Sequence, residues 1–191
     1  MTESGPESAE EAFAEIERLR EKIASLEARV RHLDELAHQD ALVPVPNRRG
    51  FFRELESLIA RVSRYGESAA MLFVDIDGLK RINDGLGHKA GDEALVQVAT
   101  VLSNGVRKSD CVARLGGDEF GILLVHATEE SARDTASRLT ALIDNHESRC
   151  DGNRIPLGVA IGVTMIAAND SADAVIARAD RAMYDEKSAA A

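Results

Sequence analysis

Apolar residues recur along the chain in patterns that differ from one segment to the next, and each pattern predicts a different structure. In residues 16–37 they alternate at intervals of three and four, the heptad spacing of a coiled coil. The stripe consists of Ile16, Leu19, Ile23, Leu26, Val30, Leu33 and Ala37. Isoleucine or valine at the first heptad position and leucine at the fourth favour a parallel two-stranded coiled coil. We therefore expect this helix to form a homodimer.

Charged residues beside the stripe agree with a parallel pair of helices. Across the pair they would place opposite charges together: Glu15 with Arg20, Lys22 with Glu27, and Arg29 with Asp34. Such exposed pairs contribute little individually, but together they select register and partner. The alternative is a single amphipathic helix whose charges are only solvated, although a lone helix of this length is marginal in water.

Beyond this helix the patterns indicate a hinge and then one globular domain. Pro44 and Pro46 lack amide donors and push the preceding residues out of the helical region, so the helix should stop before Asp40. We divide the chain into a coiled-coil helix (1–39), a hinge (40–47) and a domain (48–191). Apolar spacing in the domain predicts, in chain order, a helix over 51–64, a strand over 69–74, a helix over 90–106, strands over 110–115 and 119–125, a helix over 129–144, a strand pair within 155–166 and a helix over 172–187. The βαββαβ order predicts an α+β fold of ferredoxin-like type, with its helices over one side of the sheet.

Composition narrows the functional classes. The 191 residues carry 23 Lys and Arg against 33 Asp and Glu, a net charge of −10, which excludes a broad basic face for a nucleic acid polymer. The cysteines Cys111 and Cys150 are too few for a disulfide framework or a thiolate zinc site. The N-terminal residues do not resemble a signal peptide, and no apolar run approaches the roughly 20 residues of a membrane span. We expect a cytoplasmic protein that binds no membrane. Any nucleotide that it binds should be small and should need a metal.

Two acidic pairs stand at the ends of predicted strands. Asp75 and Asp77 follow the first apolar strand, whereas Asp118 and Glu119 follow the glycine pair 116–117, which we expect to form a two-residue type I′ turn. Taken alone, Asp75 and Asp77 are better explained as the end of a strand and the start of a turn before Gly78, and the second acidic pair changes that balance. In a βαββ unit the hairpin would lie beside the first strand, and the carboxylates together would form a divalent-metal site.

Between these pairs, residues 80–92 are rich in side chains suited to a nucleotide. Lys80 can neutralise phosphate oxygens. Asn83 and Asp92 offer an amide and a carboxylate for the edge of guanine, and His88 can bond a ribose. A helix cap, a loop histidine and a charge near a helix N-terminus explain the last three residues equally well when each is considered alone.

Considered together, the motifs resemble one family. They are, in chain order, Asp75-Ile76-Asp77, Lys80-Arg81-Ile82-Asn83-Asp84, Gly87-His88-Lys89-Ala90-Gly91-Asp92 and Arg114-Leu115-Gly116-Gly117-Asp118-Glu119-Phe120. Over roughly residues 40–187 the chain resembles the diguanylate cyclase (GGDEF) domain family. The resemblance implies a nucleotide-cyclase-type sheet. It also implies an enzyme that condenses two GTP molecules into cyclic di-3′,5′-guanylate (cyclic di-GMP) with release of two pyrophosphates.

The resemblance assigns roles in catalysis. It implies that Mg²⁺ (or Mn²⁺) is held by Asp75, the backbone carbonyl of Ile76, Asp118 and Glu119. The implied catalytic residues are Asp118, Glu119 and Lys80. Asp118 would accept the proton of the attacking 3′-hydroxyl, and Lys80 would stabilise charge on the triphosphate.

The resemblance also assigns binding sites. The residues implied to bind the GTP substrate are Asn83, His88, Asp92 and Lys187. Arg107 and Asp110 match the RxxD site through which the product, cyclic di-GMP, inhibits the enzyme. The alternative is a charged turn before a strand, and the spacing of the two residues favours the product site.

One such domain holds one GTP, so the implied reaction needs two domains facing each other, and the coiled coil would supply the second. The alternative function is a catalytically inactive receptor or interaction module that binds cyclic di-GMP through Arg107 and Asp110. The intact carboxylates favour the enzyme, because a receptor needs no metal site. A regulatory protein that acts on the helix is a hypothesis for the input signal.

Overall fold

The computed structural model describes residues 9–150 and 153–190, and the chain divides after Ala37 into two compact units. The first unit carries the helix α1 (Ala9–His38), whose predicted seam is exposed in a single chain. The described seam side chains that keep 44–64% of their surface are Ile16, Leu19, Ile23, Leu26 and Val30, whereas the side chain of Leu33 lies outside the described set. Neither α1 nor any other helix among the described residues is long and apolar enough to cross a membrane.

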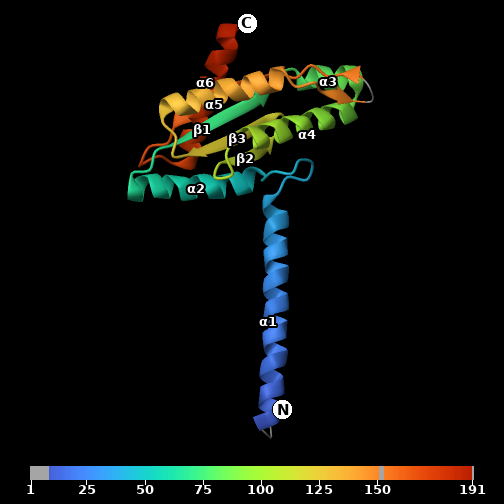
Figure 1. Cartoon of the computed structure of the whole chain (residues 1–191), viewed down its shortest axis with the longest axis vertical. Coiled ribbons are helices and arrows are strands. Elements are labelled where there is room, and N and C mark those ends of the chain that lie inside the picture. Colours follow the sequence, from blue (N-terminus) through green and yellow to red (C-terminus); the bar gives the residue numbers. More distant parts are fainter. Residues whose placement is uncertain (1–8, 151–152, 191) are drawn as a thin grey trace. The chain divides into compact units, whose positions relative to one another are not determined.

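The second unit is built on a four-stranded antiparallel sheet with the strand order β2-β3-β1-β6 (Figure 1). Its elements are α2 (Arg48–Tyr65), β1 (Ala69–Ile76), α3 (Leu79–Leu86), α4 (His88–Gly105), β2 (Cys111–Gly116), β3 (Glu119–Val125), α5 (Glu129–Asp144), β6 (Val159–Met165) and α6 (Ala172–Ala190). In addition, β4 (Arg149–Cys150) pairs with β5 (Asn153–Arg154) in a separate small sheet. With α4 and α5 as crossovers, the order β1-α4-β2-β3-α5-β6 confirms the predicted ferredoxin-like α+β fold.

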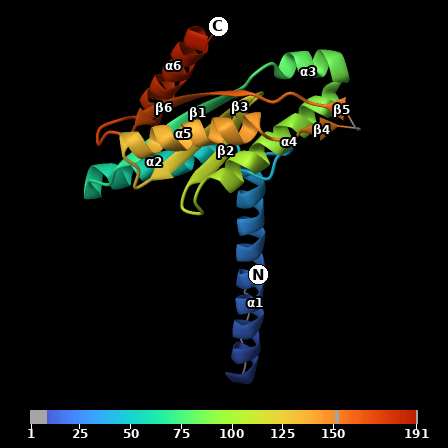
Figure 2. The same ribbon diagram turned by 45° about the horizontal axis from the view of Figure 1, so that its top comes forward.

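Helices cover both faces of the sheet (Figures 1 and 2). On one face Leu72 and Val74 of β1 pack with α4 and α5, and on the other Met71 and Phe73 pack with α2 and α6. The expectation of helices over one side only is therefore wrong. The sequence of β1 explains the difference, because an uninterrupted apolar strand has to bury both of its faces.

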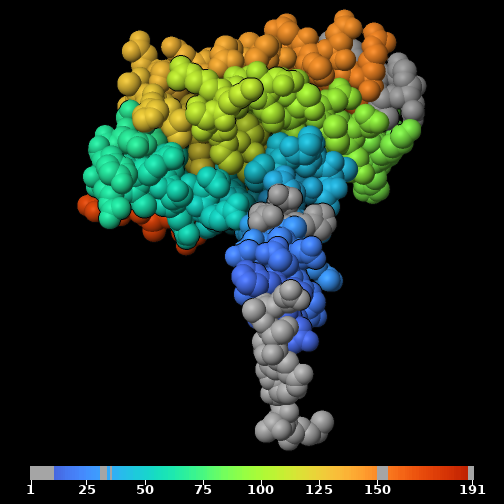
Figure 3. Space-filling view, turned by 60° about the horizontal axis from the view of Figure 1, so that its bottom comes forward, coloured from blue at the N-terminus to red at the C-terminus, as the bar shows by residue number. Residues whose placement is uncertain are grey.

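The segment 40–47, which connects the two units, is fixed on the second one. Val43 and Val45 are buried in its core, with 2% and 3% of their surface exposed. The Asp40 carboxylate accepts the backbone amides of Leu42 and Val43 at 2.9 and 3.1 Å. Figure 3 shows this segment, in light blue, on the surface between α2 and α4. The two prolines thus end the helix at the point where the chain joins the domain.

Two further elements differ from the prediction. Residues 155–166 contain one strand, β6, instead of a strand pair, because Pro156 has no amide to donate to a ladder. The helix α3 was not predicted. It lies between Gly78 and Gly87, which have φ angles of +72° and +85°, so the turns that bound it depend on glycine.

Candidate active site

Three carboxylates meet at one end of the sheet. Asp75 of β1 lies directly opposite Glu119, the first residue of β3, so the two side chains share the sheet face that α2 and α6 cover. Asp118 stands in the turn before Glu119, and its carbonyl oxygen accepts the amide of Ile76 at 3.1 Å. The predicted placement of the hairpin beside the first strand is confirmed.

The turn that presents Asp118 is displaced by one residue from the prediction. Gly116 still pairs with Glu119, and the strand register shifts between Arg114 and Gly116, so the two turn residues are Gly117 and Asp118. Both glycines have positive φ, +150° and +54°. A bulge of this kind bends the strand and removes a residue from the ladder. It therefore places Asp118 in the turn and not on the strand.

Arg114 holds this turn in place. Its Nε and Nη2 donate to the carbonyl oxygen of Gly117 at 3.1 and 2.8 Å, and its Nη1 donates to the Asp40 carboxylate at 3.2 Å. One guanidinium thus joins the segment that enters the domain to the acidic turn. Nothing in the local spacing of the sequence pairs Arg114 with Asp40, so this role could not be predicted from the motif that Arg114 begins.

The acidic residues disfavour one another's charged forms. Partial burial raises the pKa of Asp75, and the neighbouring Asp118 and Asp77 raise it further, against the opposing hydrogen bond from Lys187. Burial also raises the pKa of Glu119, together with the charges of Asp118 and Asp75. A cation at this end of the sheet would relieve this repulsion.

Lys187 supplies a positive charge to the same cluster. Its Nζ lies 2.5 Å from Asp75 Oδ1 and 3.2 Å from Asp77 Oδ1. Burial by itself would lower the pKa of this lysine, but its hydrogen bonds to the two carboxylates raise it above the ordinary value. The ammonium is therefore the counter-charge of this part of the cluster.

Lys187 reaches the cluster because α6 lies close to β6. A Cβ at Gly162 would overlap backbone atoms of α6, including the amide nitrogen of Met183. Gly162 is opposite Phe73 in the ladder. From Met183 to Lys187 the helix advances about 6 Å, and from Phe73 to Asp75 the strand advances about 6.6 Å. The close crossing therefore brings together two residues that are far apart in the sequence.

The donor groups at this end of the sheet fit a hard divalent cation. The residues expected as ligands offer only oxygen atoms, from the carboxylates of Asp75, Asp118 and Glu119 and the carbonyl of Ile76. Mg²⁺ prefers such donors, takes few of them from the protein and completes its shell with phosphate and water. In the described parts of the chain, no three His, Cys, Asp or Glu side chains are already gathered closely enough to hold a metal ion. The carboxylates are thus neighbours, but their arrangement as metal ligands is not preformed.

Lys80 and three of the four residues expected to bind the nucleotide lie on the helix pair α3–α4, whereas the fourth, Lys187, lies on α6. Lys80 is exposed in the first turn of α3, His88 is the first residue of α4, and Asp92 is exposed one turn later. Asn83 packs on the α4 backbone, since a Cβ at Gly91 would overlap its side-chain amide. Because Gly91 has no side chain, Asn83 can lie beside Asp92, the residue that follows Gly91. The pair presents an amide, a carboxylate and an imidazole from two adjacent helices.

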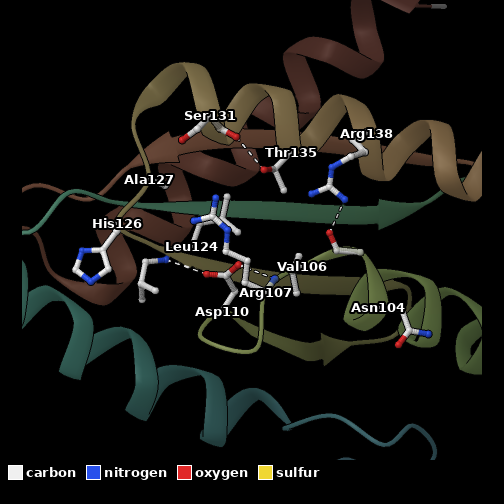
Figure 4. Close-up of a pocket in the computed structure, with 12 residues that line it drawn as sticks. Asn104, Val106, Arg107, Asp110, Leu124, His126, Ala127, Ser131, Thr135 and Arg138 are labelled. Carbon is white, nitrogen blue, oxygen red and sulfur yellow. Dashed lines mark hydrogen bonds between the residues drawn. The ribbon is translucent and has the colours of Figure 1, made fainter.

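A second site is a pocket of about 320 Å³ that contains Arg107 and Asp110 (Figure 4). The Asp110 carboxylate accepts the backbone amides of Arg107 at 3.0 Å and Val125 at 3.2 Å, so it shapes the turn. The Arg107 side chain extends into the pocket. Arg138 of α5 lines the same pocket and donates to the carbonyl of Gly105 at 2.6 Å. Arg138 was not predicted, because it lies too far along the chain from Arg107 for a local motif to include both.

A comparison with protein families matches residues 37–191 to the family described as diguanylate cyclase, GGDEF domain. The chain belongs to the GGDEF domain family. The matched range contains all residues of the acidic cluster, the helix pair and the pocket described above. The resemblance drawn from the sequence motifs is therefore confirmed.

Relatives of this GGDEF chain include named cyclases. It is 37% identical over 159 residues to the probable diguanylate cyclase DgcE of Escherichia coli strain K12, and the aligned region covers 83% of this chain and 14% of that protein. It is 39% identical over 153 residues to the diguanylate cyclase TpbB of Pseudomonas aeruginosa strain UCBPP-PA14, and the aligned region covers 79% of this chain and 35% of that protein. The GGDEF chain thus spans well under half the length of these two curated relatives.

Solved structures show the same fold. The coiled coil and GGDEF domain of DgcB from Caulobacter crescentus, in complex with c-di-GMP, matches with a TM-score of 0.80 at 25% identity, over 90% of this chain and 93% of that one. The diguanylate cyclase SiaD from Pseudomonas aeruginosa, in complex with its activator SiaC, matches with a TM-score of 0.77 at 27% identity, over 94% of this chain and 72% of that one.

Proposed function

We propose that this chain is a diguanylate cyclase that condenses two GTP molecules into cyclic di-GMP and two pyrophosphates. The observation that carries the proposal is the meeting of Asp75, Asp118 and Glu119 at one end of the sheet, where β1 leads directly into the helix pair α3–α4. Membership of the GGDEF family and the cyclase names of its relatives support it. Phosphoryl transfer needs positioning and charge neutralisation more than covalent chemistry, and these residue types supply both.

The proposed catalytic roles divide between carboxylates and lysines. The proposed ligands of Mg²⁺ or Mn²⁺ are Asp75, the carbonyl of Ile76, Asp118 and Glu119. When bound, the metal supplies positive charge to the triphosphate. Asp118 accepts the proton of the 3′-hydroxyl that attacks the α-phosphorus of the other GTP. Lys80 and Lys187 bind phosphate oxygens and stabilise the charge that develops on them.

The proposed nucleotide site is the corner between α3 and α4. Asp92 accepts hydrogen bonds from the N1 and N2 donors of guanine, and the amide of Asn83 serves its O6 or N7. His88 bonds the ribose. Since adenine has no donors at these two positions, a carboxylate at Asp92 favours GTP over ATP. The contact of Asn83 with the α4 backbone supports this assignment, because it fixes the amide beside the carboxylate.

The proposed active form is a homodimer through α1. Each domain binds one GTP, and a coiled coil would hold a second domain at a high effective concentration. The exposed apolar seam of α1 supports the dimer, because a stripe of this kind is stable when a second helix covers it. We propose the same helix as the place where a regulatory protein acts. Since the substrate is a nucleoside triphosphate, the proposed location is the cytoplasm.

The proposed feedback site is the pocket of Arg107 and Asp110. Its two arginines, Arg107 and Arg138, suit the phosphates of cyclic di-GMP, because guanidinium groups bind phosphate with charge-assisted hydrogen bonds. Asp110 would act there by shaping the turn that carries Arg107.

Incubation of the purified chain with GTP and Mg²⁺, followed by chromatography of the products, tests the proposal. The parent should form cyclic di-GMP, and Asp118→Asn should not. Asp134→Asn removes an exposed carboxylate from α5 and should remain active, so it is the matched control. If the parent makes no product at concentrations where the dimer is demonstrated, the cyclase is excluded. A titration with cyclic di-GMP would then test the receptor function.

A further inference from the structure

The ammonium of Lys187 binds the carboxylate of Asp75, which is also a proposed ligand of the metal. It lies 2.5 Å from Asp75 Oδ1 and 3.2 Å from Asp77 Oδ1. The side chain of Asp75 is 19% exposed and that of Asp77 is 48% exposed, so the lysine bridges an inner and an outer carboxylate. Asp77 has no part in the metal site or the catalytic steps proposed above.

We propose that Lys187 is the resident counter-ion of the acidic cluster, and that Asp77 is a positioning residue that keeps the ammonium at the site when a divalent cation takes Asp75. The inference rests on the proposed function, because it concerns a site that binds a metal and a triphosphate. It also gives the order of two binding steps at this site. The cation first displaces Lys187 from Asp75, and the displaced ammonium then becomes available to bind phosphate.

The geometry supports an exchange of partners without movement of the helix. Two positive charges at the Asp75 carboxylate repel each other, so the ammonium and the cation compete for it. The α6 backbone is fixed by its close packing on Gly162, one turn before Lys187. The lysine stem is flexible, and its ammonium binds without a preferred plane. A rotation of the side chain therefore suffices to leave Asp75, while Asp77 retains it on the exposed side.

This arrangement couples the metal to the nucleotide. In the nucleotide-free protein, the cation binds against the competing ammonium. When a triphosphate is present, its oxygens draw Lys187 away and the cation binds more tightly. By thermodynamic reciprocity the cation also strengthens nucleotide binding. Without the lysine, the part of this coupling that runs through Asp75 and Lys187 is lost.

Binding of Mn²⁺ alone to the nucleotide-free full-length chain, measured from the electron paramagnetic resonance signal of free Mn²⁺, tests the counter-ion. Lys187→Met should bind Mn²⁺ more tightly than the parent by roughly fivefold or more. Arg181→Met removes a positive charge from an exposed position of the same helix and should bind like the parent. Asp75→Asn should lose saturable binding. The counter-ion role is overturned if Lys187→Met and the parent have the same affinity.

A double-mutant cycle tests Asp77. If Asp77 acts through the lysine, Asp77→Asn should weaken Mn²⁺ binding in the parent, because Lys187 then binds Asp75 alone. The same substitution should have little effect on Mn²⁺ binding in Lys187→Met. An equal loss in both backgrounds would make Asp77 a metal ligand and refute the positioning role. These readouts need no turnover. If the Mn²⁺ affinities change as expected but GTP gives no product, the cyclase function is wrong and the counter-ion role of Lys187 is supported. If GTP gives product but Lys187→Met binds Mn²⁺ like the parent, the cyclase function is supported and the counter-ion role is wrong.

Discussion

Replacing Gly162 with alanine tests how closely α6 has to lie on the sheet. The new Cβ would meet the carbonyl oxygen of Ala179 and the amide nitrogen of Met183, both of them backbone atoms. Because a helix backbone cannot swing aside as a flexible side chain can, the whole of α6 would have to move. Overpacking typically costs about 1–3 kcal/mol, and a backbone clash belongs in the upper half of that range, about 2–3 kcal/mol. For a domain of this size, the melting temperature should fall by roughly 4–12 °C.

The assay is thermal unfolding of the full-length chain followed by circular dichroism. Gly85→Ala is the matched control, because Gly85 lies in α3 and a Cβ there has nothing within 4 Å. Alanine is better than glycine inside a helix by about 0.5–1 kcal/mol, so the control should melt at or above the temperature of the parent. If Gly162→Ala melts at the temperature of the parent while the control behaves as expected, α6 does not depend on a close approach at Gly162.

Three further predictions concern the acidic cluster, the pocket and the coiled coil. The raised pKa of Glu119 means that its contribution to stability is present at low pH and is lost as the pH rises through the folded-state pKa. Glu119→Gln should therefore raise the melting temperature of the metal-free protein at pH 7, with a gain that shrinks toward pH 4; a gain independent of pH would contradict the electrostatic cause. Asp110→Ala should lower the free energy of unfolding by about 1–3 kcal/mol, because two backbone amides lose their acceptor, whereas Arg107→Ala should leave stability unchanged and lower the calorimetric affinity for cyclic di-GMP. Leu26→Asp places a charge in the seam and should give a monomer in analytical ultracentrifugation, while Ala28→Asp, on the outer face of the heptad, should sediment like the parent.

Much of the fold could be predicted, because the element ends carry local signals. The predicted bounds of β3 and α5 agree with the structure, since a glycine turn precedes the one and Thr128 caps the other with a hydrogen bond from Ser131. The continuous apolar run in β1 also indicates that helices cover both faces of the sheet, so our expectation of helices on one side only could have been avoided. The neighbouring positions of Asp75 and Glu119 also followed from the order of the strands.

The remaining details of the site depend on contacts that local spacing does not encode. A Gly-Gly pair fits either of two turn registers, and a bulge selected the one that puts Asp118 in the turn. The contact of Lys187 with Asp75 depends on how closely α6 crosses β6, which Gly162 decides from another part of the chain. The link from Arg114 to Asp40 likewise joins two segments that only the folded chain brings together.

The site is assembled from the beginning and the end of the domain, and this bears on its biosynthesis. Asp75 lies in β1, the first strand of the domain, while β6 and Lys187 are made after the other strands of its sheet. Until then, β1 lacks a neighbour on one side and the acidic cluster lacks its lysine. During synthesis the chain can therefore form α2, α4 and the hairpin before β6 and α6 are made, but it completes the acidic cluster only after α6 has emerged from the ribosome. We expect a partly synthesised domain, or one cleaved before α6, to be inactive in the proposed formation of cyclic di-GMP.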